Sequence, residues 1–339
     1  MNPLAAALNK AIGVNDDIQT VKHWLDTGFP PLNKAISNRY DCGFPSGRLI
    51  EMFGPESAGK TLIATKVMIS AQQAGGIAAF MDHENSFEID HAERLGLQTD
   101  PTIGNWIFKT PETFEESIDT LREVGQIVRD GKLIPDEAPI VFVYDSLASM
   151  VPQSTLKKAE ERNMNDNTAL ARATSAHLPT IVMLCAKYNI CCIFLNQVRM
   201  KMGVMFGDPT TTPGGNAPKF YASVRIQLGR SQIKEGTDKV GQSIGASVIK
   251  NKVSNPFRKC KWDYFYDGGL DIIGGTIDHL VEIGKLPAKA GYIEFGGKKL
   301  RKKQLIKFFK ENGGMEALKK LLPKETHEAG FVKDEVEAS

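Results

Sequence analysis

One short stretch, residues 49–61, constrains the fold more than any other part of the chain. It reads L-I-E-M-F-G-P-E-S-A-G-K-T and contains the spacing Gly54-x-x-x-x-Gly59-Lys60-Thr61. The apolar residues before Gly54 predict a short buried strand, and the residues after Gly59 predict a helix. A phosphate-binding loop requires this order of strand, loop and helix. The alternative, a chance match on an ordinary turn, is disfavoured because both flanking elements are present.

Each position of this loop has a physical role in binding a nucleoside triphosphate. The glycines let successive N–H groups point inward, and the N-terminus of the helix adds about half a positive charge. Lys60 is expected to reach the β- and γ-phosphates, and the Thr61 hydroxyl is expected to bind Mg2+. The predicted nucleotide-binding positions of the loop are Gly54, Pro55, Glu56, Ser57, Ala58, Gly59, Lys60, Thr61 and Leu62.

Buried strands alternate with helices after this loop, which predicts an α/β fold with a mostly parallel, twisted sheet. The expected strands are Leu49–Phe53, Ile77–Met81, Trp106–Phe108, Ile140–Tyr144 and Ile190–Leu195. An amphipathic helix is expected over Pro111–Asp130, and another over Thr168–Tyr188 that Pro179 should kink or break.

Polar residues follow three of these strands, where the ligands of parallel sheets bind. Asp145 is placed to hold Mg2+ through water, although many strands end in Asp for capping reasons. Glu84 is the candidate for the base that polarises the attacking water, and its alternative is a solvated loop acid. Gln197 is the third residue of this kind.

The composition fits an intracellular globular protein. The 339 residues are 42% hydrophobic and 24% charged, which suits a large core with one or two attachments. A net charge of +2 means that any basic surface is local. The five cysteines form no Cys-x-x-Cys pair, which indicates a reducing compartment. Without a signal peptide or a long apolar stretch, a cytoplasmic protein with no membrane segment is expected.

The two ends of the chain differ from its centre. Residues 1–35 are expected to form an arm that docks on the chain's own core or on a neighbouring subunit, because a lone short helix is marginal in water. After Phe220 the pattern becomes rich in strands, predicted at Phe220–Leu228, Ser247–Val253 and Lys261–Tyr266. The expected domains are an arm at 1–35, an ATPase core at 36–270, a small α/β domain at 271–322 and a mildly acidic, disordered tail at 323–339.

Residues 196–225 read N-Q-V-R-M-K-M-G-V-M-F-G-D-P-T-T-T-P-G-G-N-A-P-K-F-Y-A-S-V-R. This segment closely resembles the second DNA-binding loop and following strand of the bacterial RecA recombinases. The same resemblance holds for the loop at 54–61, for F-M-D-H-E at 80–84, D-S at 145–146 and K-N-K-V-S-N-P-F at 250–257. It covers roughly residues 35–310, and the short arm fits a divergent or phage-encoded member.

The resemblance implies a fold and a set of site residues. The fold is a RecA-type ATPase core with a polymerisation arm and a small C-terminal domain. Glu84 looks like the catalytic glutamate, and Gln197 is similar to the glutamine that senses the γ-phosphate. Lys250 and Lys252 resemble the pair that reaches ATP from the adjacent subunit. His91 stands where an aromatic ring stacks on adenine, and the resemblance places subunit-interface contacts at Lys219, Phe220 and Arg225.

Two loops, at about 153–167 and 196–219, are the expected DNA-binding loops. The second is longer than twenty residues, and loops of that length in a compact domain are usually functional or disordered. Its basic side chains and glycine N–H groups suit phosphates, and its apolar side chains could wedge between bases or belong to the core. The predicted DNA-binding residues are Arg172, Ser175, Arg199, Met200, Lys201, Met205, Phe206, Gly214, Gly215 and Asn216.

The resemblance implies a DNA-dependent ATPase of homologous recombination that uses ATP and Mg2+. Expected partners are single-stranded and double-stranded DNA, further copies of the chain in a helical filament, a single-strand-binding protein and loader proteins. The basic run Lys298–Lys303 would capture duplex DNA, or it is simply a solvated face. A hexameric helicase on the same core, and a filament protein that has lost hydrolysis, are the alternatives.

Overall fold

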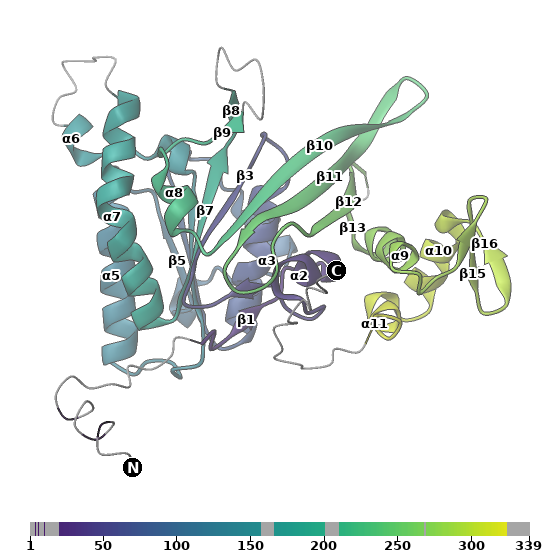
Figure 1. The fold of residues 1–339 in the computed structure, drawn as a ribbon, viewed down its shortest axis with the longest axis horizontal. Coiled ribbons are helices and arrows are strands. Elements are labelled where there is room, and N and C mark those ends of the chain that lie inside the picture. The colour runs from purple at the N-terminus through teal and green to yellow at the C-terminus, as the bar shows by residue number, and fades with distance from the viewer. Residues whose placement is uncertain are drawn as a thin grey trace, which may run out of the picture. The chain divides into compact units, whose positions relative to one another are not determined.

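The computed structural model describes residues 4, 6, 10, 20–156, 166–200, 210–267 and 269–323. The chain divides after Lys261 into two compact units, here called the first and the second unit. The ribbon in Figure 1 shows a sheet with helices on both faces in the first unit, and short helices beside a small sheet in the second.

The first unit is built on the parallel sheet that the alternating pattern predicts. Its parallel strands are β3 (Leu49–Gly54), β4 (Ile77–Asp82), β5 (Trp106–Lys109), β6 (Ile140–Asp145) and β7 (Ile190–Gln197). The strands that lie wholly in this unit run in the order β11-β10-β3-β7-β6-β4-β5. Because β3 lies between β7 and β10, the loop after β3 is at the centre of the carboxyl edge.

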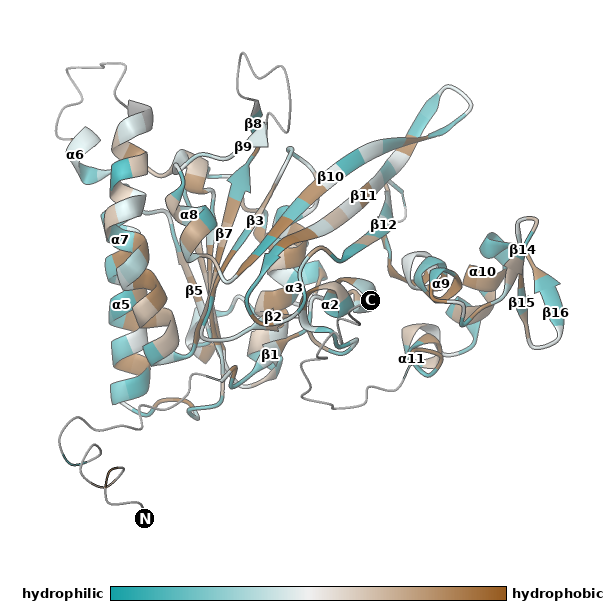
Figure 2. Ribbon diagram, in the orientation of Figure 1, coloured by the Kyte–Doolittle hydropathy of each residue, from teal (hydrophilic) through white to brown (hydrophobic). Residues whose placement is uncertain are grey.

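Apolar residues make these strands because both faces of the sheet are covered. Helix α3 (Lys60–Gln73) lies on one face, and α5 (Phe114–Asp130) and α7 (Asp166–Tyr188) lie on the other (Figure 1). The hydropathy colouring in Figure 2 shows the central strands as predominantly apolar. Cys191 and Cys192 on β7 are fully buried free thiols, as their place in an apolar strand predicts.

Two of the helix predictions differ from the structure, one in where the helix begins and one in whether it is broken. Helix α5 begins at Phe114, because the side chain of Thr113 accepts a hydrogen bond from the Glu116 N–H at 3.0 Å and caps the helix. Helix α7 is continuous through Pro179, so the predicted break does not occur. Burial of Leu178 and Ile181 in the core offsets the backbone hydrogen bond that proline cannot make.

Helix α7 also has the length and apolar composition of a membrane span over Thr168–Tyr188. Its residues Leu178, Ile181 and Leu184 pack instead in the core formed with the sheet and α5. Core helices of globular proteins pass the same test, so this helix gives only weak evidence for a membrane.

The strand predicted over Phe220–Leu228 is in fact a short helix followed by a long hairpin. Phe220 belongs to α8 (Ala217–Tyr221), whose first turn contains Pro218, and β10 begins at Val224. Strand β10 continues to Glu235 and pairs with β11 (Asp238–Asn251). Sequence periodicity missed the outer half of this hairpin, because its residues are exposed and polar on both faces.

Part of the predicted arm belongs to the core of the first unit. Strand β1 (Trp24–Leu25) pairs with β2 (Phe44–Pro45), and α2 (Pro30–Ser37) follows between them. Leu25 and the apolar side chains Phe29, Leu32 and Ile36 are fully buried. The remainder of the arm, apart from residues 4, 6 and 10, lies outside the described residues up to 19.

The second unit begins at Trp262, before the predicted boundary at residue 271, and it contains short helices and a small sheet. The boundary between the two units lies within strand β12 (Lys259–Phe265), which pairs with β13 (Gly269–Asp271). The helices are α9 (Ile272–Glu282), α10 (Lys302–Glu311) and α11 (Gly314–Lys319), and the sheet strands are β14 (Ala288–Lys289), β15 (Tyr292–Phe295) and β16 (Lys298–Leu300). The predicted tail lies outside the described residues from 324 onward.

Candidate functional site

The loop between β3 and α3 needs both glycines of its motif. A Cβ atom on Gly54 would lie 2.5 Å from the carbonyl oxygen of Leu228 on β10, so only glycine fits beside that strand. Gly59 has φ of 80° and Ser57 has φ of 54°, in the left-handed region. This backbone curls over the N-terminus of α3, where N–H groups and the helix dipole favour an anion.

Lys60 begins α3 and folds back over the loop. Its Nζ donates to the carbonyl oxygens of Gly54, at 3.2 Å, and Pro55, at 2.8 Å. Burial lowers the pKa of the Lys60 amine, while the charges of Asp145 and Glu84 act in the opposite direction. The cation is therefore held at the anion-binding end of the helix.

Thr61 and Asp145 form the pair that the sequence predicts for Mg2+. The Thr61 hydroxyl donates to Asp145 Oδ2 at 2.9 Å, which joins the start of α3 to the end of β6. Burial, with a smaller contribution from Glu84, raises the pKa of Asp145 to about 6. Oxygen ligands of this kind suit Mg2+, and Thr61 and Asp145 would hold the ion at this point. Within the described residues no group of three or more His, Cys, Asp or Glu side chains could hold a metal alone.

A turn after β4 presents Glu84 at the same edge. The Asp82 carboxylate accepts the N–H groups of Glu84, Ser86 and Phe87 at 3.0, 2.9 and 3.0 Å, which fixes this turn. The exposed Glu84 carboxylate points toward β6 and β7, because its Oε1 accepts hydrogen bonds from Ser146 Oγ, from Ser149 Oγ at 3.1 Å and from Gln197 Nε2 at 3.2 Å. The predicted pair of Glu84 and Gln197 is thus in direct contact.

Sequence reasoning did not include Ser146 and Ser149 among the site residues. Both follow the end of β6, and Ser149 closes the 3-10 helix Leu147–Ser149. Serine is common in loops after strands, so nothing in the local sequence marks these hydroxyls as partners of Glu84. The contacts arise because β4 and β6 are neighbours in the sheet.

A buried ion pair lies behind the loop. Arg225 Nε donates to Glu51 Oε2 at 2.6 Å, and these side chains are 9% and 1% exposed. Asn196 Nδ2 donates to Glu51 Oε1 at 2.9 Å and to the Pro213 carbonyl at 3.1 Å. Arg225 was predicted at the subunit interface, but its guanidinium is internal. The interface prediction therefore depends on the other residues.

Helix α8 carries two of the remaining interface residues, Lys219 and Phe220. Phe220 is 70% exposed, and Lys219 is partly exposed beside it. Lys250 Nζ donates to the carbonyl oxygens of Lys219 and Phe220 at 2.6 and 2.7 Å, and Lys252 Nζ donates to that of Phe220 at 3.3 Å. The two predicted ATP-reaching lysines thus sit together at the C-terminal end of α8.

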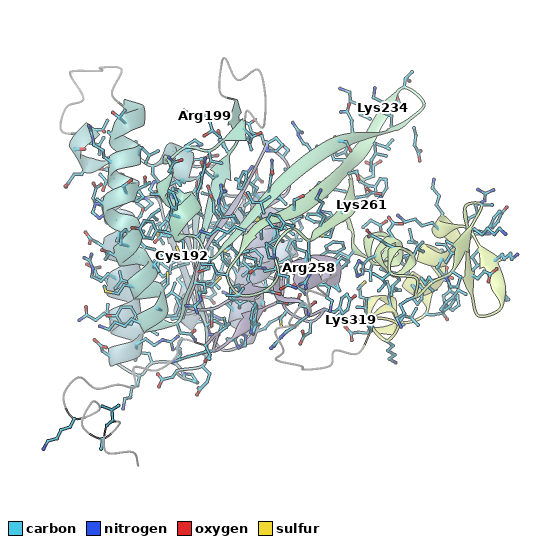
Figure 3. All side chains as sticks on the ribbon, in the orientation of Figure 1. Cys192, Arg199, Lys234, Arg258, Lys261 and Lys319 are labelled. Atoms are coloured by element: carbon cyan, nitrogen blue, oxygen red, sulfur yellow. The ribbon has the colours of Figure 1, made fainter. Side chains whose placement is uncertain are left out.

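The predicted DNA-binding residues that the structure describes gather around the top of α7. Arg172 and Ser175 are exposed on this helix. Gly214 and Gly215 pack against it, since the Thr174 hydroxyl donates to the Gly214 carbonyl at 2.7 Å. Asn216 is exposed just before α8, and Arg199 lies at the same edge on β8 (Arg199–Met200), as Figure 3 shows.

A cavity of about 370 Å³ lies between these segments. Its lining includes Ser149, Thr155, Arg199, Thr212, Gly214 and Gly215, together with apolar residues of α7 and of the segment after β6. The cavity therefore joins the beginning of the first predicted DNA loop to both ends of the second.

Several predicted positions have no structural account. Residues 157–165 of the first loop and the predicted contacts Lys201, Met205 and Phe206 lie outside the described residues, as does the side chain of Met200. His91 is exposed on α4 (Ile89–Arg94), and its predicted stacking on adenine stays a prediction.

In the second unit, the basic run lies on β16 and the start of α10. Lys298, Lys299, Arg301 and Lys303 are exposed. Lys299 pairs with Glu294 at 3.7 Å and Lys302 with Asp278 at 2.7 Å, so acids outside the run neutralise part of it.

Comparison with known proteins decides the family. A family model described as the RecA N-terminal domain matches residues 12–271. The chain belongs to the RecA family. RecA of Geobacter sulfurreducens is 39% identical over 261 residues, which are 76% of this chain and 72% of that protein. RecA of Mycobacterium sp. strain KMS is 38% identical over 305 residues, 88% of this chain and 82% of that protein.

Solved structures agree with the RecA-type fold. The crystal structure of the RadB recombinase matches with a TM-score of 0.50 at 19% identity, over 73% of this chain and 98% of that one. The resemblance and the fold class inferred from the sequence are therefore confirmed, while the roles of individual RecA-family site residues stay predictions.

Proposed function

We propose that this RecA-family protein is a DNA-dependent ATPase of homologous recombination. It forms a helical filament on single-stranded DNA, pairs that strand with a homologous duplex and exchanges strands. The observation that carries the proposal is the meeting, at one edge of one sheet, of a phosphate-binding loop and two segments predicted to bind DNA. Family membership supports this function, and none of the observations above favours the helicase alternative.

The proposed chemistry assigns a task to each residue of the edge. Lys60 and the loop N–H groups bind the triphosphate, and Thr61 and Asp145 hold Mg2+, which neutralises charge on the phosphates. Glu84 takes the proton of the attacking water, which requires its carboxylate to be ionised. Lys250 and Lys252 are proposed to reach the nucleotide of an adjacent subunit, beside the exposed Phe220.

Gln197 connects hydrolysis to DNA in this proposal. Its Nε2 contacts Glu84 at 3.2 Å, and the second DNA loop follows it directly. A nucleotide γ-phosphate that attracts the Gln197 amide would change the start of that loop, so ATP favours the DNA-binding filament and hydrolysis releases it. We propose that this activity is carried out in the cytoplasm, with a single-strand-binding protein and loader proteins as partners.

The decisive experiment is strand exchange between circular single-stranded DNA and a homologous linear duplex with ATP. A Lys60→Ala variant should form no joint molecules. Lys187→Ala is the matched control, because this lysine ends α7 at the opposite edge of the sheet and should leave exchange unchanged. Displacement of a strand from a forked, non-homologous substrate would support the helicase instead.

A further inference from the structure

Glu84 is held in one orientation by three hydrogen bonds to a single carboxylate oxygen. Its Oε1 atom accepts from Ser146, from Ser149 at 3.1 Å and from Gln197 at 3.2 Å. These three contacts fill Oε1 and hold the carboxylate toward β6 and β7, while the second oxygen, Oε2, can still accept a proton. The donors therefore restrain the orientation of Glu84, and its carboxylate can turn toward an attacking water only when they release it.

The three donors are attached to different parts of the molecule. Ser146 is 1% exposed and fixed at the end of β6, whereas Gln197 leads into the second DNA loop. Ser149 is partly exposed and ends the 3-10 helix, only a few residues before α6 (Gln153–Leu156) begins the first DNA loop. Ser149 is thus the donor tied to the other DNA-binding segment.

Ser149 also faces the cavity of about 370 Å³ that lies between the two predicted loops. Thr212, which also lines the cavity, is 5% exposed, and its hydroxyl has no hydrogen-bond partner among the parts of the chain that the structure describes. A buried hydroxyl without a partner is costly, so the cavity is suited to a polar atom of a ligand. Arg199, another lining residue, suits a phosphate.

We propose that Ser149 is a positioning residue that makes hydrolysis depend on nucleic acid. In the chain without DNA, the Ser149 hydroxyl donates to Glu84 and helps to hold its carboxylate. A single strand bound along the cavity moves the segment from Ser149 to Thr155 away from Glu84 and breaks this hydrogen bond. The hydrogen bond from Gln197 to Glu84 responds to the bound nucleotide, whereas the hydrogen bond from Ser149 responds to DNA bound at the first loop. This inference deepens the proposed function and rests on it.

The test compares the ATPase rate of Ser149→Ala without DNA and with saturating poly(dT). Loss of a hydrogen bond to the exposed Glu84 carboxylate should raise the DNA-free kcat by about three- to tenfold. The DNA-saturated kcat should stay within about twofold, because that state lacks the contact already. The ratio of the two rates should fall accordingly, with an unchanged KM for ATP.

Two controls separate this effect from a change in folding. Ser149→Thr keeps the hydroxyl and should restore the wild-type ratio, and Ser231→Ala, exposed on β10, should change neither rate. Urea unfolding checks that each variant is folded.

An unchanged ratio in Ser149→Ala, or a parallel fall of both rates, would overturn the inference while leaving the proposed function intact. If poly(dT) fails to stimulate the wild-type ATPase and strand exchange also fails, the proposed function is wrong. The claim that Ser149 couples hydrolysis to DNA is then wrong as well. The DNA-free rate of the variant still shows in that case whether Ser149 restrains Glu84.

Discussion

Replacing Arg225 by Met should lower the free energy of unfolding of the first unit by about 3–5 kcal/mol. The change removes a guanidinium that lies 2.6 Å from Glu51 and 4.7 Å from the centre of the Phe53 ring. Methionine roughly replaces the aliphatic volume of arginine, so the main effect is the loss of charge and hydrogen bonding.

The magnitude follows from what Glu51 retains. Its carboxylate is 1% exposed, and after the change Asn196, at 2.9 Å, is the one donor left to it among the residues that the structure describes. An uncompensated buried charge is far more costly than an exposed one, because water cannot reach it. A double variant, Arg225→Met with Glu51→Leu, should recover most of the loss, since no buried charge then remains unpaired.

Urea unfolding measured by tryptophan fluorescence tests this prediction. A Trp262→Phe background leaves Trp24 and Trp106, both in the first unit, as reporters. The matched control is Arg122→Met, whose ion pair with Asp119 has a similar distance of 2.7 Å but side chains 46% and 57% exposed. Exposed pairs contribute at most about 1 kcal/mol. If the two variants lose equal stability, burial does not determine the strength of the Arg225 pair.

Three further results are expected. Since burial raises the pKa of Asp145 from 3.8 to about 6, its ionisation costs stability as pH rises through this range. The free energy of unfolding of Asp145→Asn should therefore exceed that of the wild type by about 3 kcal/mol at pH 8, a difference that vanishes well below pH 4, and equal pH dependence of urea unfolding would refute this. Lys60→Ala should abolish binding of a fluorescent ATP analogue without changing the urea midpoint, and retained binding would show that the loop alone suffices. Replacing Lys298, Lys299 and Arg301 by Gln should weaken duplex binding and reduce the slope of log K against log salt by about 0.9 per phosphate contact, which an unchanged slope would contradict.

Much of the site could be predicted from the sequence because its signals are local. The spacing from Gly54 to Thr61 requires one backbone conformation before one helix, and the structure confirms that strand, loop and helix. Glu84, Asp145 and Gln197 could be placed together because parallel strands end at one edge. The confirmed family resemblance came mainly from one continuous segment, residues 196–225, joined by shorter matches at 54–61, 80–84, 145–146 and 250–257.

Other features depend on residues far apart in the chain. Ser146 lies 62 positions from Glu84, and Arg225 lies 174 positions from Glu51, so no local pattern joins them. Glu51 is an exception, because its position in the sequence by itself indicates a buried partner. A carboxylate inside an apolar strand is almost never buried unless it is paired.

By itself, the sequence determined the phosphate-binding loop, the parallel sheet and the family, because backbone conformation and strand burial depend on neighbouring residues. The tertiary structure alone decided which side chains meet at the carboxyl edge. Strand order puts β4 beside β6 and β10 beside β3. That order turned Arg225 from an expected subunit contact into a buried partner of Glu51, and it brought the hydroxyl of Ser149 to the carboxylate of Glu84.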